Sequence, residues 1–244
     1  VGSSGAGKST LAKLICGFEL PVSGRILLEG RDLLNDTIRE RAEKIGYVMQ
    51  NPNQMISKPM IWDEVELALL KMGMTEEERR ERVEETLKIC GLYPFRKWPV
   101  SALSYGQKKR VTIASILVCR PQILILDEPT AGLDPRGRDD ILGLVAKLHS
   151  EQGMTIVLVS HSMEDVARYV SRLVVMNHGE KAFDGTPKEV FRHYKELETM
   201  GLAAPQITYV VHALRERGIA VDQDITTVEE ARDAILGLWK NVTV

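Results

Sequence analysis

The sequence predicts an α/β fold in which a mostly parallel sheet is covered by helices and carries an inserted α-helical subdomain. Short apolar runs alternate with helix-length amphipathic segments, which is the pattern of strands joined by helical crossovers. This alternation of strands and helices is interrupted between about residues 51 and 110, where helical patterns follow one another without strands. The expected strands are RILLE (25–29), IGYVMQ (45–50), ILILDE (123–128), TIVLVSH (155–161) and RLVVM (172–176).

Helix signals complete this outline. Amphipathic segments predict helices over residues 9–16, 136–152 and 163–170. Thr75 and Glu78 form a capping box in the inserted subdomain, and Val83, Leu87 and Cys90 then fall on one face. We predict a sheet core from residues 1–50 and 111–200, a helical subdomain over 51–110 and a C-terminal extension over 201–244. Further helix starts are expected at Thr186 with Pro187, and at Thr227 with Glu230.

Composition excludes several classes of protein. The 244 residues are 44% hydrophobic and carry a formal net charge of −2, so there is no basic excess that predicts nucleic acid as a partner. The three cysteines Cys16, Cys90 and Cys119 have no zinc or redox spacing. The longest apolar runs are far shorter than the ~20 residues that a membrane-spanning helix needs.

The first ten residues, VGSSGAGKST, contain the pattern GxxxxGKS of a Walker A phosphate-binding loop. Its glycines let backbone N–H groups converge on phosphate oxygens at the start of a helix, where Lys8 also reaches them. The alternative is a Gly/Ser-rich terminus with a chance match, but a helical pattern follows at once. The predicted nucleotide-binding residues are Gly2, Ser3, Ser4, Gly5, Ala6, Gly7, Lys8, Ser9, Thr10 and Gln50.

Two acids end the apolar run ILILDE. A strand that carries Asp127 at its carboxyl end brings this carboxylate beside the phosphate loop, where it can hold Mg²⁺. Glu128 is then placed to polarise an attacking water molecule. Acids at the end of a strand can also belong to a turn that only keeps the surface soluble. The Walker A pattern disfavours this interpretation.

Polar residues follow two more of the expected strands. Gln50 comes after IGYVM and His161 after TIVLVS, so both are expected near the γ-phosphate at the carboxyl edge of the sheet. Each alone is more often a structural polar residue, but the joint pattern favours the functional interpretation. We therefore predict Glu128 and His161 as catalytic residues. The predicted Mg²⁺ ligands are Ser9, Gln50 and Asp127.

A second anion-binding helix start is predicted at LSYGQ. Ser104 and the backbone of Gly106 begin a helix there, about twenty residues before Asp127. One γ-phosphate cannot easily use two helix starts from one subunit, so two subunits that share two nucleotides are indicated. The residues of this segment are Leu103, Ser104, Tyr105, Gly106 and Gln107.

These motifs together resemble the nucleotide-binding subunit of an ABC transporter. A narrower resemblance is to the ATPases of energy-coupling factor importers. The segments that carry it are QNPNQ (50–54), DEVELAL (63–69) and the C-terminal GLAAPQITYVVHALRERG (201–218). The ordered motifs are Walker A GSSGAGKST (2–10), Gln50, signature LSYGQ (103–107), Walker B ILILD (123–127), Glu128, D-loop AGLD (131–134) and His161.

The resemblance implies a RecA-like P-loop NTPase that hydrolyses ATP with Mg²⁺. It implies a head-to-tail homodimer or heterodimer of ATPase subunits, in which the signature acts in trans and Asp134 communicates between the two sites. It also implies a transmembrane coupling subunit, a substrate-binding membrane component and a peripheral position on the cytoplasmic face of the cell membrane. The transported solute would be a vitamin, a vitamin precursor or a metal ion.

Two expectations concern departures from the family. Tyr105 stands where the commonest signature has a second glycine, and we expect a helical backbone there with the ring pointing away from phosphate. Family members also carry a front section with an adenine-stacking aromatic residue before the Walker A loop, so we expect the natural protein to start earlier.

Other functions stay open. One is a non-transport ABC ATPase of the DNA-repair or translation-factor type, and another is the ATPase of a different ABC transporter class. The former needs heptad arms, zinc-binding cysteines or a second ATPase domain, which are not visible in the sequence. A regulatory module that binds nucleotide without hydrolysis is disfavoured because Glu128 and His161 are both present.

Overall fold

The computed structural model describes residues 1–242, with side chains to Trp239, and its chain forms two units. The terminal unit contains Val1–Lys8 and Ser160–Val244, and the sheet unit contains Ser9–Val159. Residues 243 and 244 of the predicted C-terminal extension lie outside the described residues. Within the described part of the chain, none of the helices has the length and apolar character needed to cross a membrane.

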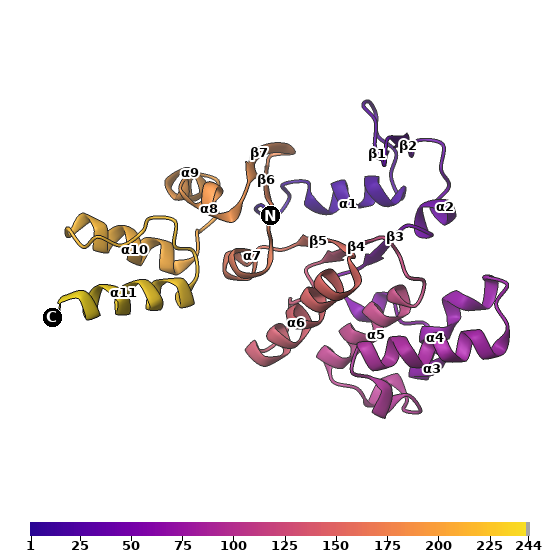
Figure 1. Ribbon diagram of the computed structural model, residues 1–244. Helices are drawn as coiled ribbons and strands as arrows, with labels where there is room; N and C mark the ends of the chain where they lie inside the picture. Colours follow the sequence, from indigo (N-terminus) through magenta and orange to yellow (C-terminus); the bar gives the residue numbers. More distant parts are fainter. Residues whose placement is uncertain (243–244) are drawn as a thin grey trace. The chain divides into compact units, whose positions relative to one another are not determined.

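The sheet unit is built on three parallel strands (Figure 1). β4 (Ile123–Asp127) lies between β3 (Ile45–Val48) and β5 (Thr155–Val159). The register pairs Val48 with Leu126, and Asp127 with Val159. The three strands therefore end together, and the residues that follow them emerge at one edge.

The apolar sequence of β4 is explained by burial. Leu124, Ile125 and Leu126 are fully buried, because β4 is the central strand and both of its faces are covered. On one face the core includes Ala12 and Cys16 of α1 (Lys8–Cys16). The other face shares a core with the helices that follow β3 and with α6 (Pro135–Gln152).

Between β3 and β4 the chain forms only α- and 3-10 helices, apart from one isolated bridge between Met60 and Pro99. In Figure 1 these helices gather on one side of the sheet unit. Val83, Leu87 and Cys90 are buried there, as their helical spacing predicts. The helices are α3 (Ile61–Glu66), α4 (Glu76–Ile89), α5 (Tyr105–Leu117) and the 3-10 turns Pro52–Gln54, Leu67–Lys71, Tyr93–Phe95 and Val100–Ala102.

The terminal unit pairs β6 (Leu173–Asn177) with β7 (Glu180–Gly185) in an antiparallel hairpin. Its core holds Phe191 and Leu197 from the helices that follow the hairpin. A smaller apolar cluster joins the last two helices. The helices of this unit are α7 (Met163–Tyr169), α8 (Pro187–Phe191), α9 (Tyr194–Thr199), α10 (Gln206–Glu216) and α11 (Val228–Val242).

The strand and helix predictions agree with most of this architecture. The segment RILLE differs, since only Leu27–Leu28 form a strand (β1), and it pairs antiparallel with β2 (Arg31–Asp32) rather than joining the parallel sheet. RLVVM likewise pairs with β7 in the antiparallel hairpin. Helix α2 (Ile38–Ala42) follows β2 and was not predicted. The domain boundaries at residues 50, 110 and 200 stay a prediction.

Candidate nucleotide-binding site

The Walker A loop is anchored to β6 within the terminal unit. Met176 donates its backbone N–H to the Val1 carbonyl (2.9 Å), and Gly2 forms a parallel bridge with Met176. Gly2, Gly5 and Gly7 have φ values of +154°, +78° and +95°, which other residues rarely adopt. A Cβ on Gly2 would lie 2.4 Å from the Met176 carbonyl oxygen, so only glycine fits against the strand.

Lys8 places its ammonium group inside this loop. Its Nζ donates to the carbonyl oxygens of Gly2 and Ser3, both at 2.9 Å. The loop thus joins a fixed cation, glycine-dependent backbone turns and the first turn of α1, which is a combination suited to phosphate. These residues fit the triphosphate of a nucleotide.

His161 belongs to the terminal unit as well and follows the buried Ser160. The Ser160 hydroxyl accepts a hydrogen bond from the Ser162 N–H (3.0 Å), and Ser162 in turn caps α7 through the Asp165 N–H (3.4 Å). These bonds fix the backbone on both sides of the exposed His161. The imidazole is therefore carried on an ordered turn.

Asp127 ends β4 inside the sheet unit and is 8% exposed. Its Oδ2 accepts a hydrogen bond of 2.9 Å from the hydroxyl of Tyr47, which lies on the neighbouring strand β3. Burial, together with this bond to Asp127, raises the pKa of the Tyr47 phenol, which stays a donor. A carboxylate held in this way has the oxygen chemistry that Mg²⁺ prefers.

Glu128 has an unusual backbone. Its φ is +47°, although the next residue is Pro129, and a residue before proline favours an extended conformation. The Glu128 N–H donates to the Val159 carbonyl (2.9 Å), and its own carbonyl accepts from the Ala131 N–H (3.1 Å). Strained backbone of this kind gathers at functional sites.

A buried lysine, which was not among the residues predicted from the sequence, joins two of the predicted site residues. Lys109 in α5 is 4% exposed, and its Nζ donates to the carbonyl oxygens of Gln50 (3.2 Å) and Glu128 (3.0 Å). Burial lowers the pKa of Lys109 to about 8, against a smaller opposite effect of the Glu128 charge. At neutral pH the group is mainly a cation. Its only sequence signal is a lysine at a position where the helix faces the core.

The signature segment starts α5 as predicted. Ser104 accepts a hydrogen bond from the Gln107 N–H (3.3 Å), and the Gln107 side chain accepts one from the Ser104 N–H (2.9 Å). Tyr105 is helical, which confirms the expected backbone. Its ring packs against Gly132 of the D-loop, since a Cβ on that glycine would lie 3.2 Å from the ring.

The D-loop adjoins the signature segment. Asp134 caps α6 by accepting a hydrogen bond of 2.9 Å from the Gly137 N–H. A cavity of about 660 Å³ is lined by residues of the start of α5 and of the D-loop, including Ser104, Gln107 and Asp134. The sheet unit therefore brings together the two segments that the resemblance assigns to the subunit interface.

Glu64, the second residue of the segment DEVELAL (63–69), fixes the segment that follows Gln50. It is a buried acid of α3. Its Oε2 accepts hydrogen bonds from the N–H groups of Ser57 (2.8 Å) and Lys58 (2.7 Å). The loop between β3 and α3 is thus held by one carboxylate.

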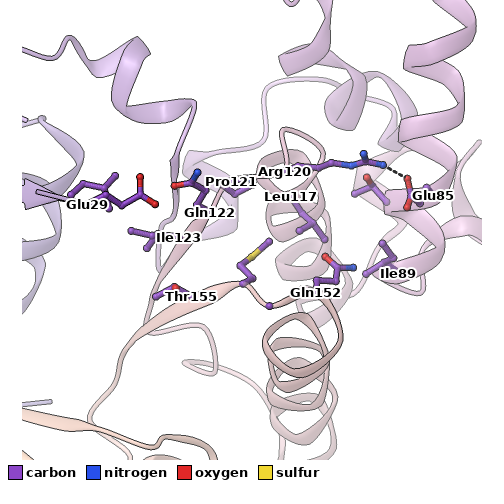
Figure 2. Close-up of a pocket in the computed structure, with 14 residues that line it drawn as sticks. Glu29, Glu85, Ile89, Leu117, Arg120, Pro121, Gln122, Ile123, Gln152 and Thr155 are labelled. Carbon is purple, nitrogen blue, oxygen red and sulfur yellow. Dashed lines mark hydrogen bonds and ion pairs between the residues drawn. The ribbon is translucent and has the colours of Figure 1, made fainter. Parts of the chain in front are cut away.

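A further cavity of about 730 Å³ lies at the other end of the strands. Its wall includes Ile123 and Thr155, the first residues of β4 and β5. Figure 2 shows Arg120 and Glu85 at this cavity, joined by an ion pair of 2.6 Å. Because Asp127 ends the same strand, this cavity is separate from the predicted catalytic residues.

The predicted site residues divide between the two units. Gly2–Lys8 and His161 belong to the terminal unit. Within the sheet unit, Lys109 links Gln50 and Glu128, and β4 delivers Asp127 and Glu128 in succession. The sheet unit contains Ser9, Thr10, Gln50, Leu103–Gln107, Asp127, Glu128 and Asp134.

Comparison with known proteins decides the family. The family described as ABC transporter matches residues 1–131 of this chain. An energy-coupling factor transporter ATP-binding protein, EcfA2 of Clostridium tetani, is 42% identical over 99% of this chain and 85% of its own length. The chain belongs to the ABC transporter ATP-binding family. The nucleotide-binding proteins of this family are ATPases coupled to transport.

A solved structure supports the same fold for this ABC protein. The structure of cbiO1 from Clostridium perfringens, described as part of the ABC transporter complex cbiONQ, has a TM-score of 0.76 and 37% identity. The match covers 87% of this chain and 85% of that one. The ABC ATPase fold and the resemblance to energy-coupling factor ATPases are thereby confirmed.

Other relatives are longer than this ABC chain. A putative ABC transporter ATP-binding protein of Clostridium perfringens is 53% identical over 83% of the chain, which spans 35% of that relative. One from Enterococcus faecalis is 48% identical over 92% of the chain, which spans 41% of it. The chain thus corresponds to less than half the length of these relatives.

Proposed function

We propose that this protein hydrolyses ATP to ADP and phosphate, and that a dimer of such ATPase subunits powers import through an energy-coupling factor membrane complex. The observation that carries the ATPase assignment is the end of β4. There a tethered carboxylate, Asp127, is followed at once by Glu128, whose backbone is held in a left-handed conformation. The strand thereby delivers two carboxylates in succession to its carboxyl edge, where nucleotide hydrolysis needs a metal ligand and a base.

Each site residue has a distinct part in the reaction. The backbone turns of Gly2–Gly7 and the Lys8 ammonium bind the β- and γ-phosphates and neutralise their charge. Glu128 orients the attacking water and accepts its proton, while His161 and Gln50 bind near the γ-phosphate. When bound, Mg²⁺ supplies positive charge to the phosphate oxygens. Ser9, Gln50 and Asp127 are the residues that would hold it.

The signature segment acts on the nucleotide of a second subunit in this proposal. Ser104 starts a helix whose N–H groups and positive end suit a γ-phosphate. It shares a cavity wall with Asp134, the residue proposed to communicate between the two sites. Leu103 is buried, and therefore supports the segment from the core rather than touching the nucleotide.

The names of the relatives support the membrane partners that we propose. The names of the EcfA2 relatives, and the description of cbiO1 as part of a transporter complex, support an assembly with a transmembrane coupling subunit and a substrate-binding membrane component. The protein would sit on the cytoplasmic face of the cell membrane. The proposed cargo is a small solute such as a vitamin, a vitamin precursor or a metal ion.

The ATPase assignment is tested with Glu128→Gln in the full-length protein. The amide keeps the shape of the side chain but cannot accept a proton, so we expect turnover to fall by about 10²-fold or more. The affinity for ATP, measured by equilibrium binding, should stay near that of the parent. The matched control is Glu151→Gln at the exposed end of α6. Normal turnover in the Glu128 variant would refute this role.

The transport assignment needs a separate experiment. The full-length protein is purified from membranes in detergent, and the proteins that co-elute are identified by mass spectrometry. The energy-coupling factor proposal is supported if two classes of integral membrane protein co-elute with the ATPase. The ATPase itself should then be a homodimer or be paired with a second ATPase. Co-elution with a DNA-repair complex or with ribosomes would replace it by a non-transport function.

A further inference from the structure

Lys109 has a position that neither the signature motif nor the proposed chemistry explains. It lies in α5 beyond Gln107, and its side chain is 4% exposed. Removing an ammonium group from water is costly unless hydrogen bonds replace the lost hydration. The partners of this group are therefore informative.

The partners are two backbone carbonyls from separate parts of the sequence. One belongs to Gln50, just after β3, and the other to Glu128, just after β4. The ring of Tyr105 lies 5.5 Å from the same Nζ and covers the cation from the start of α5. One ammonium thus connects the ends of two neighbouring strands with the helix of the signature segment.

The bond to Glu128 falls on a strained residue. Its φ of +47° before Pro129 is unfavourable, and its side chain direction depends on that backbone. The Ala131 N–H and Lys109 Nζ both donate to the Glu128 carbonyl, while the Val159 carbonyl holds the Glu128 N–H. Lys109 is the charged donor among these, and a charge-assisted bond is the stronger kind.

We propose that Lys109 is a positioning residue, which holds the backbone of Glu128 and of Gln50 in the geometry that hydrolysis needs and makes both depend on the placement of α5. The proposal rests on the ATPase function proposed above. It adds a physical link between the signature segment and the general base, because Ser104 and Lys109 belong to one helical segment. A tilt of α5 changes the distance from Nζ to both carbonyls and thereby moves the general base.

The first test is steady-state ATP hydrolysis by full-length Lys109→Met and Lys109→Arg. Methionine keeps an unbranched stem and removes the donors, while arginine keeps charge and donors. We expect kcat of the methionine variant to fall about tenfold or more with KM for ATP changed less than about threefold, since the interaction serves the transition state. Arginine should restore a large part of kcat. The control is Lys108→Met, the neighbouring lysine in α5, with kcat near that of the parent.

The second test does not depend on activity. Hydrogen exchange of the N–H groups of Glu128 and Ala131 is measured without nucleotide. Both should exchange at least about threefold faster in Lys109→Met than in Lys108→Met, because the turn they belong to loses a donor. Exchange in α10 serves as an internal reference and should not change.

The outcomes separate the two proposals. A methionine variant with kcat within about twofold of the parent overturns the positioning role, as does an equal loss of kcat in the Lys108 control. Loss of kcat that arginine does not restore, together with unchanged exchange at Glu128 and Ala131, also overturns it. If the parent protein binds ATP but does not hydrolyse it, the ATPase proposal fails, and the exchange result alone then supports or rejects the Lys109 contact.

Discussion

The hydroxyl of Tyr47 donates a hydrogen bond of 2.9 Å to Oδ2 of Asp127, so β3 supports the carboxylate that ends β4. Tyr47 is itself held by an edge-on contact with Phe18, with ring centroids 5.8 Å apart. The carboxylate is 8% exposed, and a buried carboxylate oxygen that loses its donor is destabilised. Tyr47 therefore keeps Asp127 in one orientation.

Tyr47→Phe is expected to raise the Mg²⁺ concentration that gives half-maximal ATPase activity. The variant keeps the ring and loses only the donor to Asp127, and partners of metal ligands typically contribute about tenfold or more to metal affinity. The measurement is a Mg²⁺ titration of turnover at saturating ATP. Tyr93→Phe, which removes a hydroxyl from a 3-10 turn of the sheet unit, is the control. An unchanged Mg²⁺ dependence would contradict this assignment of Asp127.

Lys8→Ala should weaken nucleotide binding itself. Its ammonium lies against the carbonyls of Gly2 and Ser3, where it can meet the phosphates. A bond between a charged pair contributes about 1.5–3 kcal/mol, so Kd for ATP should rise at least about tenfold. Isothermal titration is the measurement, and Lys13→Ala, an exposed lysine of α1 paired with Glu19, is the control. Equal affinity in the Lys8 variant and the parent would argue against the phosphate loop.

Leu87→Ala should destabilise the sheet unit. Leu87 is fully buried on α4, in the core shared with α3 and α5. Removing a buried leucine side chain costs about 2–5 kcal/mol in the free energy of unfolding, because a cavity is left. Urea denaturation followed by circular dichroism measures this, with the neighbouring Lys88→Ala expected within about 0.5 kcal/mol of the parent. A comparable loss in both variants would mean that α4 does not pack as described.

Thiol reactivity should follow burial in the folded protein. Burial raises the pKa of Cys16 to about 11 and that of Cys90 to about 12, so both remain neutral thiols at pH 8. Cys119 is only partly buried, and its pKa is raised by burial as well. With iodoacetamide at pH 8 we expect Cys119 to be modified first, as followed by peptide mass spectrometry. All three should react at similar rates in denaturant. Preferential labelling of Cys90 in the native protein would disagree with this core.

The sequence predicts those parts of the site that lie at the ends of strongly patterned elements. Asp127 and Glu128 follow four apolar residues, and Ser104 precedes a helix, so their local setting can be read from neighbouring residues. The hairpin strands Arg31–Asp32 and Glu180–Gly185 were missed because they are short or largely polar and carry no apolar alternation.

Long-range partners are beyond such patterns. Lys109 meets Gln50 and Glu128 only after β3 and β4 have aligned in register, and Tyr47 meets Asp127 for the same reason. Tyr47 looks like an ordinary residue of an apolar run, and Lys109 looks like one of three consecutive basic residues, Lys108–Arg110. The left-handed conformation of Glu128 is also invisible in the sequence, since Pro129 argues for an extended residue there.

The parallel register of β3, β4 and β5 also limits which changes of sequence this protein can accept during evolution. Side chains on a strand alternate between its two faces. The insertion or deletion of one residue in β4 would therefore move the side chain of Leu126, and that of Asp127, each to the face opposite its present one. It would also shift the Glu128 N–H away from the Val159 carbonyl. A substitution leaves this strand register in place, whereas an insertion or deletion within a strand changes it. We therefore expect variation in length to be confined to the exposed loops that connect the strands and helices.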